Sequence, residues 1–174
     1  MTWSARTAAV STLVLMLALT GCAQPQTPQP EKGQSSVTWE EAKAAAKAKT
    51  LEIVALIPSE EVVSVDQHET GSLFSCDETR HTWTGITYVT LVPDADIEAI
   101  TKEVEKQLAD LLRDRGDFEV TNRRDIFDDY AVTAQSTSTA ETYLLGASDP
   151  GAIAIDAWSV CFTLPEGTYP GGSF

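Results

Sequence analysis

Basic residues are scarce in this sequence. Its 174 residues include 12 lysines and arginines but 26 aspartates and glutamates, which gives a formal net charge of −14 at pH 7. Nucleic acids and anionic lipid headgroups are negatively charged and repel such a surface. The composition therefore excludes nucleic acid as a partner and favours ligands that are neutral or cationic.

Catalytic and metal-binding motifs are also missing. The sequence contains no G-x-S-x-G, CxxC, HxH or HExxH spacing. We interpret the two histidines, His68 and His81, as solvated surface residues, and we predict no metal site, no cofactor and no catalytic residue. An alternative stays open, in which His68 or His81 joins nearby carboxylates in the site of an envelope hydrolase or metal-dependent enzyme. Those carboxylates belong to Asp66, Glu69, Asp77 and Glu78.

One acidic segment imitates a calcium loop. Asp94, Asp96, Glu98 and Glu105 stand at positions one, three, five and twelve of an EF-hand-like count. The sixth position is Ala99, where a calcium loop needs glycine for its sharp turn. We therefore interpret these acids as the start and the solvated face of a helix.

A second charged segment, "NRRDIFDDY" at residues 122–130, combines two arginines with three aspartates. Paired carboxylates can carry out acid–base catalysis. A charged turn between two strands is the simpler interpretation, and it is the one that we adopt.

The N-terminal segment is apolar over residues 8–19 and follows Arg6. It is too short to span a bilayer, which takes about 20 apolar residues, and it is typical of an export signal. The segment ends in Leu19-Thr20-Gly21-Cys22, an aliphatic residue, two small residues and a cysteine. This ending resembles the lipobox of bacterial lipoproteins.

The resemblance implies that the Cys22 thiol carries a diacylglycerol and that the signal is removed just before Cys22. The mature chain would then be anchored by its lipid to the extracytoplasmic face of the cell membrane, since two acyl chains hold far better than one. Residues 22–36 are rich in proline and glutamine, which predicts an extended tether without a core. We therefore expect a signal peptide (residues 1–21), a tether (22–36) and a single folded domain (37–174).

Export would leave Cys76 and Cys161 in a compartment where disulfides persist, and we expect these two residues to pair. The bond would close a loop of about 86 residues, which the chain-entropy model values at about 4 to 5 kcal/mol. Two free, buried thiols are the alternative. A zinc site would need CxxC spacing, which the chain lacks.

The folded domain opens with a helical signal. Thr38 and Glu41 form a capping box, and apolar residues follow at roughly helical spacing as far as Pro58. The segment is either one long helix or a helix to about Lys49 followed by a strand over residues 51–57, which are rich in β-branched side chains.

Residues 94–115 give the clearest helix, with an apolar stripe at three- and four-residue spacing and Gly116 as a C-terminal stop. Segments rich in β-branched and aromatic residues predict strands. These segments are residues 61–65, 72–76, 81–92, 117–122, 130–136, 142–148 and 152–164, with a loop at 66–71. Residues 72–76 and 81–92 are either a strand pair or one interrupted strand. Within 81–92, alternation places Trp83, Gly85, Thr87, Val89 and Leu91 on one face and Ile86, Tyr88 and Val92 mostly on the other.

Short polar connections favour antiparallel neighbours, and the apolar helix stripe needs a sheet to cover. The sequence therefore predicts an α+β fold, a two-layer sandwich in which two helices lie on one face of an antiparallel sheet. Five aromatic residues could line a sheet face that binds a sugar or peptide, but we expect them in the core. They are Trp83, Tyr88, Tyr130, Tyr143 and Trp158.

The organisation as a whole resembles that of small actinobacterial lipoproteins of unknown function: a lipobox, a proline-rich tether, an α+β domain and two cysteines. This resemblance covers organisation only and implies no activity. We therefore expect a non-catalytic binding or scaffolding domain at the cell envelope, which engages an envelope protein or a small neutral or cationic ligand.

Overall fold

The computed structural model describes residues 37–113, 117–148 and 151–174, which belong to the second of two compact units, Gly33–Phe174. These residues form two α-helices, one 3₁₀ helix and eight strands. In chain order the elements are α1 (Trp39–Val54), η1 (Ser59–Glu61), β1 (Val62–Gln67), β2 (Ser72–Ser75), β3 (Arg80–Leu91), α2 (Ile97–Arg113), β4 (Phe118–Arg124), β5 (Tyr130–Ser136), β6 (Thr142–Ala147), β7 (Ala152–Trp158) and β8 (Phe162–Thr163).

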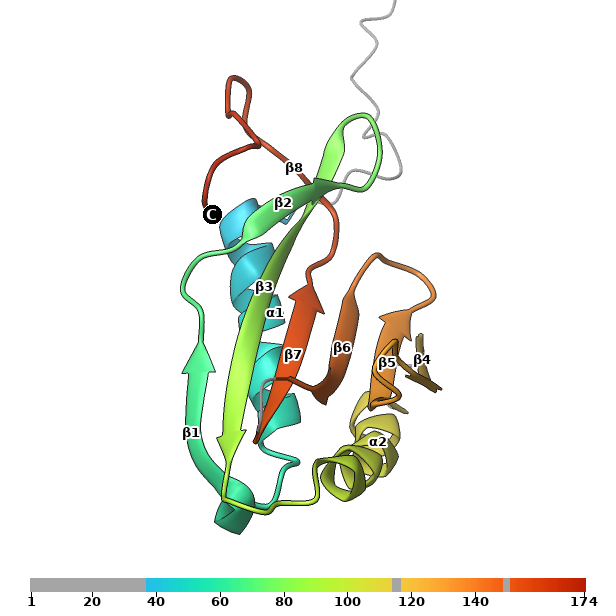
Figure 1. Cartoon of the computed structure of the whole chain (residues 1–174). Helices are drawn as coiled ribbons and strands as arrows, with labels where there is room; N and C mark the ends of the chain where they lie inside the picture. Colours follow the sequence, from blue (N-terminus) through green and yellow to red (C-terminus); the bar gives the residue numbers. More distant parts are fainter. Residues whose placement is uncertain (1–36, 114–116, 149–150) are drawn as a thin grey trace, which may run out of the picture. The chain divides into compact units, whose positions relative to one another are not determined.

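All the described strands join one antiparallel sheet (Figure 1). The strand order is β1-β3-β7-β6-β5-β4, and β2 and β8 pair with the first part of β3. Because β3 is 12 residues long, its second part is free to pair with β1 and β7. Strands β4 to β7 are neighbours in chain order, as short connections between antiparallel strands require. The predicted α+β fold with an antiparallel sheet is confirmed.

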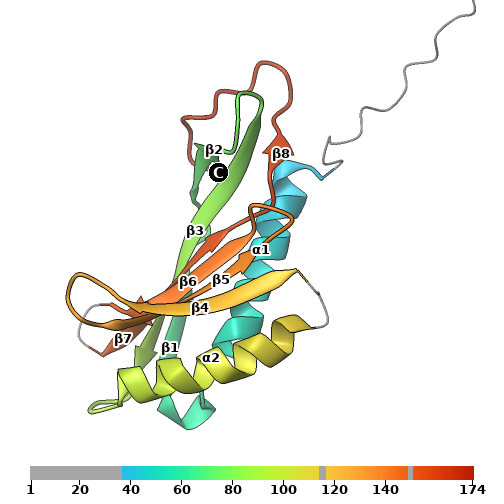
Figure 2. The ribbon, with the colours of Figure 1, turned by 90° about the vertical axis from the view of Figure 1, so that its right-hand side faces the viewer.

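Both α-helices lie on the same face of this sheet (Figures 1 and 2). Helix α1 packs against β3 and β7, whereas α2 packs against β4, β5 and β6. The hydrophobic core fills the layer between the helices and the sheet. No described helix covers the opposite face, which we call the open face.

Helix α1 begins where the capping box predicts. Thr38 Oγ1 accepts the Glu41 N–H at 3.2 Å, and the Glu41 carboxylate accepts the Thr38 N–H at 2.9 Å. The helix continues to Val54, so the alternative of a strand over residues 51–57 is wrong. Helical geometry places Ile53, which is fully buried, on the same face as the small, buried Ala46, and this face packs on the sheet.

Helix α2 begins at Ile97, three residues later than expected. Asp94 has a φ of 65°, which is not helical, and the Asp96 carboxylate caps the helix by accepting the Ala99 N–H at 3.0 Å. The apolar stripe faces the sheet as predicted, and the end of the predicted helix, beyond Arg113, lies outside the described residues. The buried residues of α2 are Ile100, Thr101, Val104, Leu108 and Leu112.

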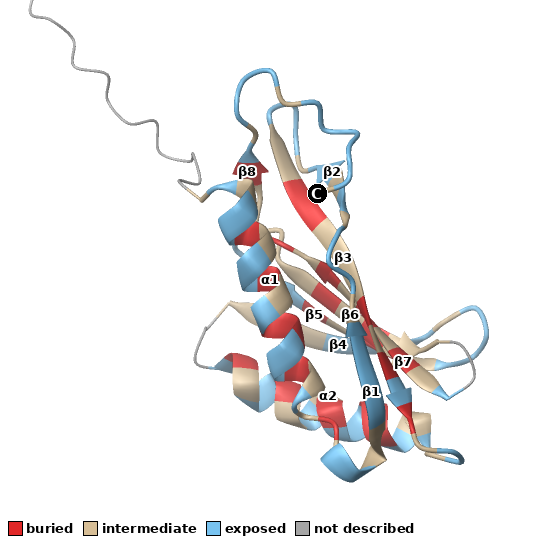
Figure 3. Ribbon diagram, turned by 90° about the vertical axis from the view of Figure 1, so that its left-hand side faces the viewer, coloured by how far each residue is buried: buried red, intermediate tan, exposed pale blue. Residues whose placement is uncertain are grey.

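Strands β3 and β7 carry the centre of the core, and their residues alternate between the two faces (Figure 3). Val89, Ile153 and Ile155 belong to the core between the sheet and the helices and have no exposed surface. The residues between them along each strand are only half-buried or exposed. This alternation confirms the predicted faces of the β3 segment.

The expected strand over residues 152–164 is broken into β7 and β8. At the break, Ser159 Oγ accepts the Trp83 N–H at 3.0 Å, and the Thr82 hydroxyl donates to the Ser159 carbonyl at 2.7 Å. These side-chain hydrogen bonds replace the regular ladder and let the chain change direction. Other strand ends differ by one or two residues. Strand β1 extends to Gln67, so the loop expected at 66–71 is shorter, and β4 extends to Arg124, whereas β6 ends one residue early, at Ala147.

Cys76 and Cys161 form the expected disulfide. Their sulfur atoms are 1.99 Å apart and their Cα atoms 6.3 Å apart. The bond joins the residue after β2 to the residue before β8 and so ties the β2–β3 hairpin to the end of the domain.

Candidate functional site

The open face of the sheet carries a row of hollows that we call the open-face groove. The first, of about 380 Å³, lies between the β2–β3 hairpin and β7. The second, of about 280 Å³, lies between the hairpin and strands β4 to β7, and a third, of about 100 Å³, continues along β6 and β7. The side chains that give the groove its chemistry are Phe74, Ile86, Arg123, Leu144, Asp156 and Trp158.

The hollows are continuous because they share residues. Trp158 lines the first and second hollows, and Asp156 lines the first and third. Leu144 and Arg123 line both the second and the third. Asp156 and Trp158 are two residues apart on β7 and therefore point to the same face, so one ligand can contact both.

Strand register places Asp156 at the centre of an apolar surface. It lies opposite Ile86 on one neighbouring strand and opposite Leu144 on the other. Within the described residues, no hydrogen-bond donor or ion-pair partner reaches its carboxylate, and Arg123 on the far side of the third hollow forms no ion pair with it. Burial raises the pKa of Asp156. A carboxylate in this position is suited to accept a cation or a hydrogen-bond donor from a ligand.

Aromatic side chains border the same groove. Trp158 is half-buried beside Asp156, and Phe74 on β2 is 59% exposed at the edge of the first hollow. The face of an indole ring attracts a cation within about 6 Å, and the attraction grows when water is excluded. A carboxylate and an indole on adjacent positions can therefore act together on one cationic group.

The disulfide closes one end of the groove. Cys76 lines the second hollow together with Thr82 and Trp158. Because the bond joins the end of β2 to the segment between β7 and β8, it restrains the hairpin wall of the second hollow.

The structure separates the two histidines. His68 follows β1 and its Nε2 lies 3.7 Å from a carboxylate oxygen of Asp66, whereas His81 pairs with Ser75 and Phe162 at the opposite end of β3. Among the described residues, no three His, Cys, Asp or Glu side chains converge as a metal site.

The prediction of a solvated surface residue holds for His68, whose side chain is 46% exposed, but is wrong for His81. His81 is half-buried, and its Nδ1 is buried without a hydrogen-bond partner in the described part of the chain. The reason is that β8 pairs with β3 at His81, an interaction that the predicted single strand over residues 152–164 did not foresee.

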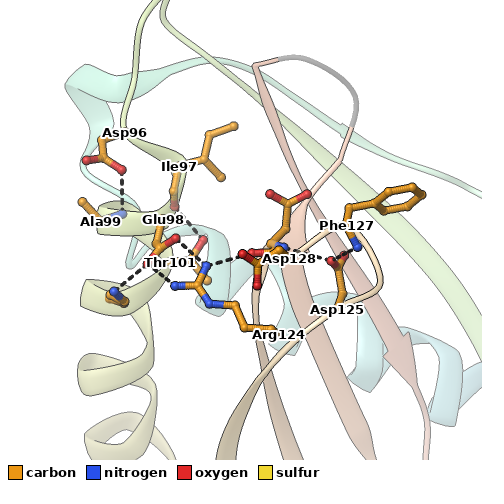
Figure 4. Close-up of polar contacts among 11 residues, drawn as sticks. Asp96, Ile97, Glu98, Ala99, Thr101, Arg124, Asp125, Phe127 and Asp128 are labelled. Carbon is orange, nitrogen blue, oxygen red and sulfur yellow. Dashed lines mark hydrogen bonds and ion pairs between the residues drawn. The ribbon is translucent and has the colours of Figure 1, made fainter.

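Of the acids in the EF-hand-like count, Asp96 caps α2 as predicted. The expectation of a solvated face is wrong for Glu98 and Glu105, which are half-buried because they are hydrogen-bonded to residues of the sheet. Glu98 accepts two hydrogen bonds of 2.7 Å from the Arg124 guanidinium and one of 2.6 Å from Lys102. The hydrogen bonds from Arg124 and then from Lys102 lower the pKa of Glu98 to about 2. Figure 4 shows Arg124 between Glu98 of α2 and the turn after β4.

Glu105 also contacts the sheet rather than an ion. Its carboxylate accepts the Tyr130 hydroxyl at 2.5 Å and the Asn122 side-chain amide at 2.7 Å. The hydrogen bond to Glu105, with burial second, raises the pKa of Tyr130 to about 12. These contacts fasten α2 to β4 and β5.

The five aromatic residues divide between the two faces. Trp83 and Tyr143 are buried in the core as expected, and Tyr130 packs partly against it. Trp158 and Tyr88 lie on the open face, because each alternates with buried neighbours on its strand. The expectation of core packing is therefore wrong for Tyr88 and Trp158, and Trp158 is one of the residues that line the groove.

Comparison with known proteins gives no relative from which a function could be transferred: no family model, no curated protein and no solved structure matches the chain. Neither of the described α-helices has the length and apolar character needed to cross a membrane.

Proposed function

We propose that this protein is a lipid-anchored, non-catalytic binding domain on the extracytoplasmic face of the cell membrane, which holds a small organic cation in the open-face groove. The observation that supports the ligand class is Asp156, a half-buried carboxylate without a partner among the described residues, which lies between Ile86 and Leu144 in the groove. The anchor is supported by the lipobox-like sequence that ends at Cys22, which lies outside the described residues.

The groove fits an ammonium or guanidinium group on an apolar body. The Asp156 carboxylate would accept its hydrogen bonds, and a hydrogen bond to a charged group contributes about 1.5 to 3 kcal/mol. The indole of Trp158 would attract the same charge, while Ile86 and Leu144 contact the apolar body. The net charge of −14 raises the local concentration of any cation.

A matched pair of probes, 2-phenylethylammonium and the neutral 2-phenylethanol, tests the ligand class. We expect the cation to bind at least about tenfold more tightly, and Asp156→Asn to remove this preference, because the charge-assisted hydrogen bond is lost. The titration is followed by NMR of the tryptophan indole N–H groups. The Trp158 signal should shift, whereas that of the buried Trp83, which donates to the Phe174 carbonyl at 3.2 Å, should stay.

Glu119→Gln is the matched control, since it removes one negative charge from an exposed position on β4 outside the groove. It should leave the cation's affinity unchanged.

Asp156→Asn should keep or raise the melting temperature, because burial disfavours the ionised carboxylate. Lowering the pH toward the raised pKa of Asp156 should weaken binding of the cation alone. Equal affinity for the two probes, or a shift of every indole signal, would contradict the proposal.

The lipid anchor has a separate test. Cys22→Ala is expected to abolish both acylation and cleavage before residue 22, since the thiol is the site of lipid attachment in the proposed reaction. Intact-mass spectrometry of the membrane fraction measures both events. The control is Thr20→Ala, which keeps a small residue before Gly21 and should be processed like the wild type. A Cys22→Ala chain that still appears in the membrane with the mass of the mature wild-type form would show that Cys22 is not the anchor.

A further inference from the structure

The turn between β4 and β5 exposes two large apolar side chains side by side in the sequence. Ile126 is 90% and Phe127 77% exposed, and among the described residues no other two exposed large hydrophobic residues are adjacent in the sequence. Burying each of these side chains would contribute about 1.5 to 3 kcal/mol of favourable free energy, which the domain forgoes by leaving both in water. The open-face groove contains neither of them.

The turn is built to hold this pair in one position. The Asp125 carboxylate accepts the Phe127 N–H at 2.8 Å and the Asp129 N–H at 3.0 Å. The backbone closes the same loop, since the Asp125 N–H donates to the Asp129 carbonyl at 3.0 Å and the Asp128 N–H to the Asp125 carbonyl at 3.2 Å. In Figure 4 the Phe127 ring points away from α2. The apolar pair is therefore preorganised outside the core.

A clamp to α2 fixes the direction of the turn. The Arg124 guanidinium donates to the Asp128 carbonyl at 2.9 Å while it holds both carboxylate oxygens of Glu98 at 2.7 Å (Figure 4). Ordering the turn before association reduces the conformational entropy that a partner would otherwise have to offset.

The charges around the pair indicate the chemistry of its partner. Asp125, Asp128 and Asp129 surround Ile126 and Phe127 in the sequence. The neighbouring Arg124 forms its ion pair with Glu98, and within the described residues none of the three aspartate carboxylates forms an ion pair, so the turn keeps an excess of negative charge. An anionic membrane surface would repel such a turn. A second copy of this chain is disfavoured as well, since it carries the same net charge of −14.

We propose that residues 125–129 form a docking turn, in which Ile126 and Phe127 enter an apolar pocket of an envelope protein and the aspartates meet lysine or arginine side chains at the rim of that pocket. Apolar anchors inside a charged rim are the usual division of labour at protein interfaces, where the anchors supply affinity and the rim supplies specificity.

Photocrosslinking with the full chain in its own cell envelope tests the docking turn. With p-benzoylphenylalanine in place of Phe127, irradiation should give one discrete protein adduct, and mass spectrometry should place the crosslink beside lysine or arginine residues of the partner. Asp128→Asn with Asp129→Asn should lower the adduct yield at least about fivefold. These changes leave the loop intact because its hydrogen bonds use only the backbone of both residues.

Two controls separate docking from chance contact. Glu40→Gln with Glu60→Gln removes the same charge from α1 and η1 and should leave the adduct yield unchanged. The same crosslinker in place of Tyr169, which is 78% exposed, should not give this adduct.

With the purified partner, Ile126→Ser together with Phe127→Ser should weaken binding at least about tenfold at an unchanged melting temperature.

Other products would overturn the proposal. An adduct with lipid would assign the turn to the membrane, and an adduct of twice the chain's mass would assign it to a second copy. A partner whose crosslinked site carries no basic residue, an adduct that survives the loss of both aspartates, or no adduct at all would each show that the turn is not a docking site of this kind.

Discussion

Replacing Cys76 and Cys161 together by serine is expected to lower the melting temperature by roughly 15 °C. The disulfide spans 85 residues of separation, so its loss restores much conformational freedom to the unfolded chain. The chain-entropy model gives a loss of about 4 to 5 kcal/mol, and a domain of this size loses about 3 °C per kcal/mol. Differential scanning calorimetry of the full chain measures the change.

The double replacement is preferable to either single one, since a single serine leaves a thiol that can pair with another cysteine. The wild type under reducing conditions is the matched control and should melt at the temperature of the variant. The native contacts around Ser159 do not involve the sulfurs and should keep the β7–β8 connection folded at low temperature. A melting temperature within about 3 °C of the wild type would show that the bond does not constrain the unfolded state as the model requires.

The same variant separates stability from binding. Cys76 lines the second hollow, so loss of the bond frees one wall of the open-face groove. Binding of 2-phenylethylammonium should therefore weaken even below the melting temperature. Weaker binding at a temperature where the variant is still folded would show that the Cys76–Cys161 disulfide also holds the open-face groove in shape.

Much of the fold could be predicted from the sequence because its signals are local and repeated. Alternation along residues 81–92 gave the correct faces of β3, and the apolar stripe of the helix predicted over residues 94–115 gave the buried side of α2. Boundaries were harder. The end of α1 was ambiguous because β-branched residues such as Ile53 suit a strand as well as a buried helix face, and only packing against the sheet decides between them.

The groove could not be predicted, because its residues come from strands whose pairing is not visible in the sequence. Asp156 stands in "AIAIDAW" as a single acid on a half-buried strand, a pattern that usually indicates a solvated face. Register alone brings Ile86 and Leu144 to its two sides. The available signal was that Trp158 and Asp156 share a face opposite to the buried Ile155, which places an aromatic ring beside a carboxylate.

The docking turn was visible in part. The sequence predicted a charged turn between two strands in "NRRDIFDDY", and the structure has this turn at residues 125–129, whereas Arg123 and Arg124 still belong to β4. The interpretation gave weight to its charges and none to Ile126 and Phe127. The sequence feature that could have indicated a docking site is the pair of adjacent apolar residues inside a polar turn, because a turn of this length has no other residues that can bury them.

Gly85→Ala is expected to destabilise the domain by about 2 kcal/mol, a typical cost of overpacking a core. A Cβ at this position would lie 2.1 Å from Cη2 and 2.6 Å from Cζ2 of the Trp83 indole. The ring cannot move aside easily, since Trp83 is only 2% exposed and its indole N–H donates to the Phe174 carbonyl at 3.2 Å. Glycine on a core strand is thus required by the close approach of the indole.

A double-mutant cycle shows whether the cost comes from this contact. In a Trp83→Leu background the space over residue 85 is free, and Gly85→Ala should cost less than about 0.5 kcal/mol, which gives a coupling of about 1.5 kcal/mol. Chemical denaturation of the four proteins measures it. Gly172→Ala is the matched control, because its nearest contact would be an ordinary 3.6 Å from the Phe174 ring. Equal costs of Gly85→Ala in both backgrounds would mean that the backbone of β3, and not the Trp83 indole, is what requires glycine here.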